Sequence, residues 1–211
     1  NSAGRVKAFT VETPYERLGG ATRYDTSLKI ANRLKKAKGV SKFDNIVVAC
    51  GTNYPDALAG GYLAYVKKAP LITVNASSET SVANYINNNL NSGGRVYILG
   101  DSGAVSSNFE RKLDNLSVNF NITRLGGKTR YETNLKIIGE AGVTETKGYS
   151  GDLLICAGNG FADSLSASAT KRPIMLVSDK LTAIQKAYIK SLSGINNIYI
   201  IGGSDVVNSS I

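Results

Sequence analysis

Arginine and aspartate supply the side chains whose types and spacing could do chemistry in this chain. They recur at matching positions: Arg17, Arg23, Arg124, Arg130, Asp56 and Asp163. A guanidinium group can grip a phosphate or a carboxylate with two parallel hydrogen bonds. The four arginines could therefore contact an anionic ligand. They could equally form ion pairs between parts of the chain, for instance with Asp56 or Asp163, and the residues alone leave both roles open.

The two aspartates each follow an apolar run and precede a segment with helical spacing. A carboxylate at a helix N-terminus stabilises the helix, and the crevice beyond the ends of parallel strands is also where α/β proteins bind ligands. No second clustered acid accompanies Asp56 or Asp163, which argues against a two-metal site for phosphoryl transfer. The glycine turns at residues 99–103 and 201–204 could offer backbone N–H groups to an anion.

The composition excludes several kinds of catalytic site. The chain has no His, which removes His-based triads and His metal sites. Its two cysteines, Cys50 and Cys156, end apolar runs and are expected to be buried strand thiols; without His they cannot build a structural zinc site. The glycine turns lack the residue order of a nucleotide-binding P-loop. We therefore expect no enzymatic activity, no cofactor and no metal.

The charge of the chain favours an anionic partner. Lys and Arg number 25 against 16 Asp and Glu, which gives a net charge of +9 over 211 residues. Nucleic acid, a membrane surface and an acidic polysaccharide all fit that charge. The aromatic residues that recur fall at expected packing positions, so nucleic-acid binding is not indicated. No apolar run reaches the length of a membrane span, and no signal peptide opens the chain, as expected for a cytosolic protein or a processed one.

The chain repeats itself, which decides its organisation. Four blocks of sequence occur twice in the same order: 17–26 returns as 124–133, 51–58 as 158–165, 69–72 as 172–175 and 96–100 as 198–202. The first two blocks are shifted by 107 positions, the third by 103 and the fourth by 102. The chain is thus expected to hold two copies of one module, at residues 1–120 and 121–211.

Each module reads as alternating strands and helices. In the first, helices are expected at 23–36, 56–66, 79–90 and 106–116, and extended segments at 45–50, 70–74, 95–99 and 118–123. Thr22 and Thr129 begin capping-box patterns with Asp25 and Glu132. Such alternation predicts an α/β fold with a mostly parallel sheet flanked by helices. The second module lacks the closing helix, so an apolar sheet face should be uncovered unless a further module completes it.

In their order, these blocks resemble the cell wall-binding repeat type 2 family of Gram-positive surface proteins. The resemblance covers nearly all of residues 14–207 and both copies. It implies Rossmann- or Toprim-like modules, usually in three tandem copies around a pseudo-threefold axis, beside a variable functional domain. It also implies non-covalent anchoring of a secreted protein to the cell wall through an anionic, teichoic-acid-like polymer, with no nucleic acid and no membrane insertion. Further modules, in cis or in trans, would complete a trimeric arrangement.

The resemblance also implies a set of ligand-binding residues. The family's Pro-Ile-Leu-Leu motif corresponds to residues 70–73 and 173–176, with departures at Thr73 and Met175. Together with the recurring arginines and the asparagine of the second block, the expected contacts are Arg17, Arg23, Asn53, Pro70, Leu71, Ile72, Arg124, Arg130, Pro173, Ile174, Met175 and Leu176. On sequence alone the motif is simply a buried strand start. A surface-assembly module that binds other proteins, and a Toprim-like hydrolase or nuclease, are the alternative functions.

Overall fold

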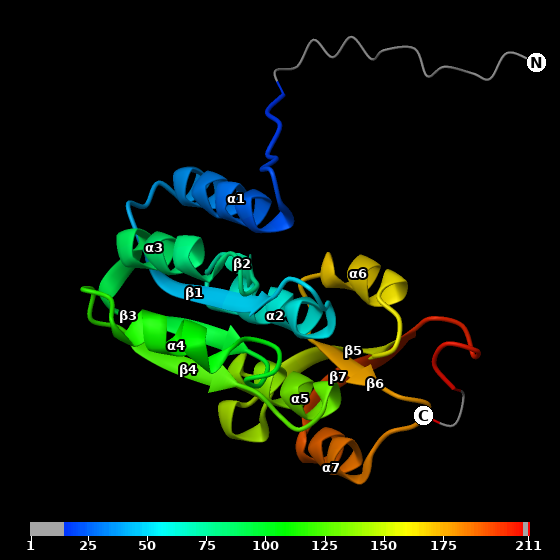
Figure 1. Ribbon diagram of the computed structural model, residues 1–211. Coiled ribbons are helices and arrows are strands. Elements are labelled where there is room, and N and C mark those ends of the chain that lie inside the picture. The colour runs from blue at the N-terminus through cyan, green and yellow to red at the C-terminus, as the bar shows by residue number, and fades with distance from the viewer. Residues whose placement is uncertain (1–14, 209–210) are drawn as a thin grey trace, which may run out of the picture.

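Two parallel β-sheets with helices packed on both faces make up the structure (Figure 1). The computed structural model describes residues 15–208 and 211. The first part of the chain forms α1 (Arg23–Lys38), β1 (Phe43–Cys50), α2 (Pro55–Val66), β2 (Leu71–Val74), α3 (Glu79–Asn89), β3 (Leu90–Leu99) and α4 (Ser107–Asp114). The remainder forms β4 (Asn121–Leu125), α5 (Arg130–Glu140), the 3-10 helix η1 (Glu145–Lys147), β5 (Ser150–Ala157), α6 (Ala162–Ser168), β6 (Ile174–Val177), α7 (Ala183–Ser191) and β7 (Gly194–Ile201).

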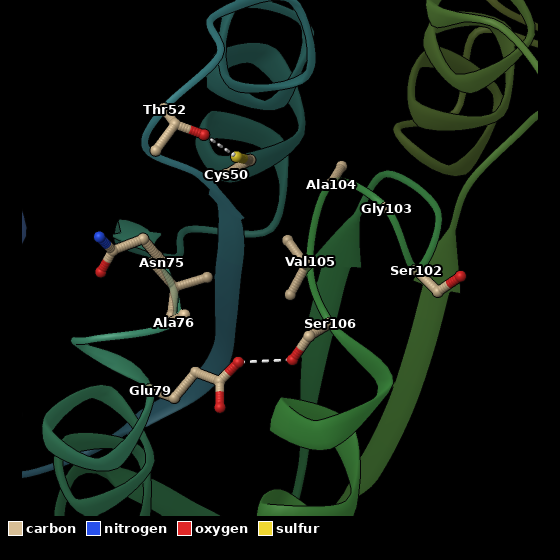
Figure 2. Close-up of a pocket in the computed structure, with 11 residues that line it drawn as sticks. Cys50, Thr52, Asn75, Ala76, Glu79, Ser102, Gly103, Ala104, Val105 and Ser106 are labelled. Carbon is tan, nitrogen blue, oxygen red and sulfur yellow. Dashed lines mark hydrogen bonds between the residues drawn. The ribbon is translucent and has the colours of Figure 1, made fainter.

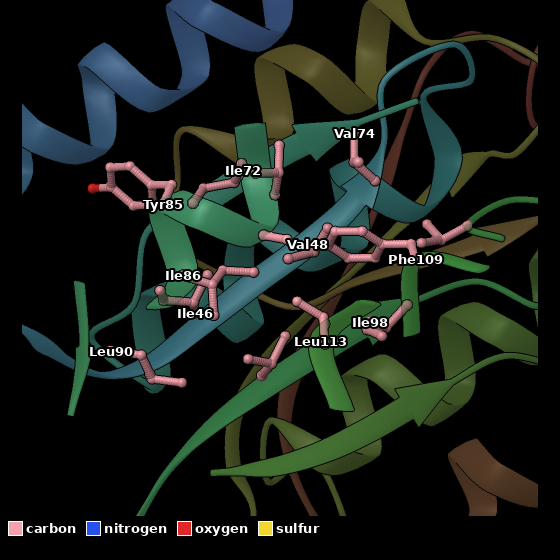
Figure 3. Close-up of a cluster of buried hydrophobic side chains, with 14 of the residues drawn as sticks. Ile46, Val48, Ile72, Val74, Tyr85, Ile86, Leu90, Ile98, Phe109 and Leu113 are labelled. Atoms are coloured by element: carbon pink, nitrogen blue, oxygen red, sulfur yellow. The ribbon is translucent and has the colours of Figure 1, made fainter. Parts of the chain in front are cut away.

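The first sheet has the strand order β2-β1-β3-β4, with every neighbouring pair parallel. Successive side chains of a strand point to opposite faces, so Ile46 and Val48 face α1, α3 and α4 while Val47 and Ala49 face α2. Figure 3 shows Phe109 and Leu113 of α4 packed over the first of these faces. Because both faces are covered, β1 reads in the sequence as an unbroken apolar run rather than an alternating one.

The second sheet repeats this arrangement with three strands in the order β6-β5-β7, again all parallel. Helices α5 and α7 pack on the face that carries Leu153 and Ile155, and α6 packs on the face that carries Leu154 and Cys156. Cys50 and Cys156 are free, buried thiols in different sheets, which confirms the interpretation of both as core residues.

Strand β7 is where the two modules differ most. Its residues Ile198, Tyr199 and Ile200 are 44%, 45% and 49% exposed, whereas the matching residues of β3 are at most 3% exposed. Strand β3 is paired with β4 and lies beneath α4. In the part of the chain that the structure describes, β7 has neither a second neighbouring strand nor such a helix. The uncovered apolar sheet surface expected from the sequence is therefore present.

Helix α5 joins the two modules. Its Leu135 and Ile138 pack on the second sheet, while Ile137 and Ala141 pack with α2 on the first sheet. At the edge of this contact the Lys67 Nζ atom lies 2.8 Å from a carboxylate oxygen of Glu140. Both modules thus share apolar packing across the α2–α5 contact. Full burial of a side chain such as Ile137 stabilises the folded state by about 1.5–3 kcal/mol.

Strand β4 shows how closely the copies are interlocked. By the predicted division at residue 120/121 it opens the second copy, yet it pairs in parallel with β3 and so belongs to the first sheet, in register from Arg95–Asn121 to Leu99–Leu125. The extended segment expected at 118–123 is therefore present a few residues later. The division of the chain at residue 120/121 stays a prediction, because β4 follows that point but completes the first sheet.

The helix starts follow the expected capping chemistry, with one difference. The Thr22 side chain accepts a hydrogen bond from the Asp25 N–H, and the Asp25 carboxylate accepts one from the Thr22 N–H at 3.0 Å, which completes the capping box. In the second module the Thr129 hydroxyl accepts from the Glu132 N–H. The Glu132 carboxylate instead accepts from the Lys128 N–H, so only half of that box forms.

Candidate ligand-binding site

A polar crevice lies between the two modules, at the carboxyl ends of β1 and β3, where α5 begins. We call it the inter-module crevice. Its volume is about 160 Å³, and it is lined by Asn53, Pro55, Asp56, Asp101, Gly127, Lys128, Thr129, Arg130 and Thr133. The end of parallel strands is the usual position of a ligand site in an α/β sheet. Two of the residues expected to bind ligand, Asn53 and Arg130, meet here although 77 positions separate them in the sequence.

Asp56 is the electrostatically unusual group of the crevice. Its pKa is raised from 3.8 to about 6, mainly by burial and also by the nearby Asp101 carboxylate, while Arg130 opposes the rise. Asp56 lies in the first turn of α2, as expected. A side chain at Gly100 would place its Cβ 2.7 Å from the Asp56 Oδ2 atom, so glycine is needed there for the close approach. The crevice therefore holds two carboxylates that face one positively charged arginine.

Arg130 and Arg23 occupy equivalent positions and make equivalent contacts. Arg130 Nη1 donates to the Gly158 carbonyl at 2.6 Å, and Arg23 Nη1 donates to the Gly51 carbonyl at 2.9 Å. Each thus ties the start of its helix to the loop that follows the first strand of its own module. Arg130 also lines the crevice, whereas Arg23 lies exposed on the first module. Lys128, which the sequence analysis did not select, lines the crevice beside Arg130 and is exposed.

The glycine turn after β3 does not form the anion-binding loop considered from the sequence. Asp101 Oδ1 accepts the N–H groups of Gly103 and Ala104 at 3.0 and 3.1 Å, and the Gly100 N–H donates to the Leu125 carbonyl at 2.8 Å. These amides already have partners, and a carboxylate occupies the place that an anion would take. Asp101 therefore stabilises the turn and contributes negative charge to the crevice.

Arg124 and its counterpart Arg17 have different environments. Arg124 Nε and Nη2 lie 2.9 and 2.7 Å from the same carboxylate oxygen of Glu110, while Nη1 donates to the carbonyls of Gly100, Asp101 and Val105 at 2.9–3.1 Å. The ion-pair role left open by the sequence is thus present, with Glu110 rather than Asp56 as the partner. Arg17 is exposed and lies apart from the crevice, beside α1.

The proline-aliphatic motif lies in the core. Ile72 is fully buried in β2, Leu71 packs against α2, and the Pro70 carbonyl accepts the Val47 N–H. The matching residues of the second module are buried in the same way: Pro173, Ile174, Met175 and Leu176. In the structure these residues thus form the buried beginnings of β2 and β6. Their assignment as ligand contacts stays a prediction, and their burial offers it no support.

A larger cavity, of about 330 Å³, lies on the other side of the strand ends, between α3 and α4. Figure 2 shows Glu79 and Ser106 facing each other across it, joined by a hydrogen bond, with Cys50 and Thr52 at its upper end. Glu79 is 5% exposed and also pairs with Lys112 at 3.0 Å. None of the described residues that line this cavity is Lys or Arg. An anionic ligand is therefore better suited to the inter-module crevice.

Within residues 15–208 and at 211, no group of three or more Cys, Asp or Glu side chains lies close enough to hold a metal ion. None of the helices that the structure describes is both long and apolar enough to cross a membrane. The side chains that line the crevice offer cations, carboxylates and an amide for binding.

Comparison with known proteins gives a consistent result. A family model described as cell wall binding domain 2 matches residues 17–110 and 124–211. The chain is similar to the N-acetylmuramoyl-L-alanine amidase LytC of Bacillus subtilis (strain 168). The alignment of 213 residues has 27% identity and covers 98% of this chain and 40% of that protein. Among solved structures it resembles Cwp6 and Cwp8 from Clostridium difficile, both with TM-score 0.76 and 27% identity.

The matched structures are much longer than this chain. The match covers 97% of this chain but 33% of Cwp6, and 90% of this chain but 31% of Cwp8. The chain thus spans less than half of the length of each of these relatives. The two segments of the family model coincide with the two copies seen in the sequence, and the α/β fold with parallel strands matches the expected class.

Proposed function

The chain belongs to the cell wall binding domain 2 family, and on that premise we propose that it anchors a secreted surface protein to the wall of a Gram-positive bacterium. In this proposal the anchoring is non-covalent and non-enzymatic, and the ligand is an anionic secondary wall polymer of the teichoic-acid type. The family description names binding rather than catalysis. The relatives' names point to the same cellular setting, since Cwp6, Cwp8 and LytC come from Gram-positive bacteria.

The composition of the inter-module crevice carries this proposal. Lys128 and Arg130, together with the N-terminus of α5, place positive charge on one side. Asn53, Asp56 and Asp101 lie opposite and can hydrogen-bond hydroxyl groups. A polymer that carries both anionic groups and hydroxyls satisfies both sides, whereas a purely anionic chain would meet two carboxylates. The net charge of +9 adds a long-range attraction to any such polymer.

The exposed face of β7 supports a second element of the proposal, a further module in cis or in trans. Ile198 and Ile200 form an apolar strip whose counterparts in β3, Val96 and Ile98, lie beneath α4 in the first module, while Tyr199 points to the opposite face of the sheet. A third module would cover this strip and give the trimeric arrangement of modules expected from the resemblance. The same strip favours surface assembly with other proteins as the second candidate function.

Co-sedimentation with Gram-positive walls, before and after chemical removal of the anionic polymer, tests the anchoring proposal. Binding should vanish with the polymer and weaken as salt increases, because charges are screened within about 8 Å at physiological ionic strength. The Lys128→Gln variant should bind more weakly than wild type. Lys190→Gln, which removes an exposed cation from α7, is the matched control and should bind normally.

Binding that persists on stripped walls would move recognition to peptidoglycan or protein and overturn the polymer part of the proposal. Equal binding by the Lys128→Gln and Lys190→Gln variants would overturn the assignment of the crevice. Binding that appears only after a third module is added would support the trimeric arrangement.

A further inference from the structure

The cavity of about 330 Å³ between α3 and α4 lies within the first module, at the carboxyl ends of β1 and β2 (Figure 2). We call it the first-module cavity. None of the described residues that line it also lines the inter-module crevice. Strand β1 is central in its sheet, because the chain passes from it to β2 on one side and then to β3 on the other. Open α/β sheets bind ligands beyond such a reversal of strand order, and the volume falls in the usual range of about 300–1,000 Å³ for small-molecule sites.

A buried ion pair makes the wall of this cavity close to neutral. The Glu79 carboxylate is buried and lines the cavity, and its Oε2 atom lies 3.0 Å from the Lys112 Nζ atom. Lys112 is not one of the lining residues, so it balances the carboxylate without entering the cavity. An anionic ligand would meet the carboxylate, and a cationic ligand would have to compete with Lys112 for it. The charges therefore favour a neutral ligand.

The Glu79 carboxylate has acceptor capacity left for the hydroxyl groups of a ligand. An ionised carboxylate offers about four acceptor positions on its two oxygens. Among the described residues, the Ser106 hydroxyl donates to Oε1 and Lys112 pairs with Oε2. Two neighbouring hydroxyl groups can donate to the positions that remain, and hydrogen bonds to a charged acceptor are about twice as strong as those between neutral groups. The carboxylate can thus bind a polar ligand that carries no charge.

Apolar side chains form another part of the lining. Val74, Ala76, Ala104 and Val105 contribute methyl groups, close to the Thr52 hydroxyl. Hydrogen-bonding groups and methyl groups together suit a ring that carries hydroxyls at its edge and C–H bonds on its faces. A sugar ring has this composition.

The second module does not repeat the groups that give this cavity its character. The sequence blocks on either side of Glu79 are shifted by 103 and 102 positions, so its counterpart is Thr182 or Leu181, and neither is an acid. Helix α4, which carries Lys112, has no counterpart after β7 in the part of the chain that the structure describes. The first-module cavity is therefore a feature of one module rather than of the repeat.

We propose that the first-module cavity binds one neutral, hydroxylated sugar ring. Glu79 accepts hydrogen bonds from the hydroxyl groups of the ring, and Lys112 balances the charge of Glu79 from outside the cavity. This site is distinct from the site for an anionic polymer and does not depend on it. Its test needs no wall polymer, so its failure leaves the anchoring proposal standing.

The first experiment is an NMR titration of the 15N-labelled chain with glucose, galactose, mannose and N-acetylglucosamine. At least one of these sugars should shift the amide signals of Gly103 and Ser106 in a saturable manner. Ala76→Trp places a large ring at an exposed edge of the cavity and should weaken binding by about tenfold or more. Ala37→Trp changes an equally exposed alanine on α1 and should bind normally. No saturable shift with any of the four sugars, or equal binding by the two variants, would overturn the proposal.

The second experiment separates a binding role of Glu79 from a structural one. Glu79→Gln and Lys112→Met both remove the ion pair, but only the first removes the carboxylate from the cavity. Glu79→Gln should weaken binding of the sugar by about tenfold, and it should strengthen binding of glucuronate, because Lys112 is then unbalanced. Lys112→Met should change the affinity for the neutral sugar by less than about twofold. Equal losses of affinity in the two variants would show that Glu79 only links α3 to α4 and would overturn the proposal.

A free sugar and a neutral sugar unit of the wall share this chemistry, and wall co-sedimentation distinguishes them. Ala76→Trp should bind walls more weakly than Ala37→Trp where the ring belongs to the wall, and equally well where the ring is a free sugar.

Discussion

Arg124 offers the sharpest test of the structural roles assigned here. Its guanidinium makes five hydrogen bonds, two to Glu110 and three to backbone carbonyls, and its side chain is 20% exposed. A hydrogen bond to a charged group contributes about 1.5–3 kcal/mol, and such contributions are not additive within one network. Water can replace part of the loss, since Glu110 is 32% exposed. We therefore expect Arg124→Met to reduce the free energy of unfolding by about 3 kcal/mol.

The repeat provides the matched control. Arg17→Met changes the same residue type at the equivalent position, but that arginine is exposed and none of the hydrogen bonds or ion pairs found in the described residues involves it. Its effect should stay below about 0.5 kcal/mol. Urea unfolding at pH 7 measures both, and the thermal midpoint of Arg124→Met should fall by roughly 6–12 °C. Equal shifts for the two variants would refute the structural role of Arg124 and return it to the ligand-binding candidates.

Three further outcomes follow. The pKa of Asp56 is about 6 in the folded chain against 3.8 unfolded, so the folded state binds the extra proton and stability should fall as pH rises from about 4 to 6. Asp56→Asn should flatten that dependence, and above pH 6 its free energy of unfolding should exceed that of wild type by roughly 1–2 kcal/mol. Asp163→Asn should change the free energy of unfolding less, because a glycine stands where the first module has Asp101. Ile137→Ala should lower the free energy of unfolding by about 2–4 kcal/mol; Ile30→Ala should lower it by less than about 0.5 kcal/mol. Asn134→Leu should cost about 2 kcal/mol, because the buried amide bridges Ile174 and Leu176 of β6. Urea midpoints at several pH values check all three.

The sequence alone was sufficient for the elements of the first module and for the duplication. The helix expected at 23–36 is α1, the run at 45–50 lies within β1, and Asp56 lies in the first turn of α2. These features are local: side-chain periodicity, capping residues and turn glycines act within a few positions, so the sequence shows them directly. The two copies were visible because the same local pattern occurs twice.

The tertiary structure decided the roles of the singled-out side chains. Arg17 and Arg124 open matching sequence blocks, yet one is exposed and the other is held by Glu110 and three carbonyls. Strand β4 pairs with the first sheet, and this pairing is what brings Arg124 to its partners. The crevice likewise exists only because α5 packs on α2, which places Arg130 opposite Asp56.

A local pattern fixes where a side chain lies along its own helix or strand, but it says nothing about which surface covers that side chain. Ile30 and Ile137 demonstrate this, since the same residue in the same turn of equivalent helices is half exposed in one module and fully buried in the other. Burial, ion pairing and a raised pKa depend on neighbours that are distant in the sequence. The sequence therefore determined the two modules and their elements, and the packing of α5 against α2 determined which recurring residues support the fold and which line the crevice.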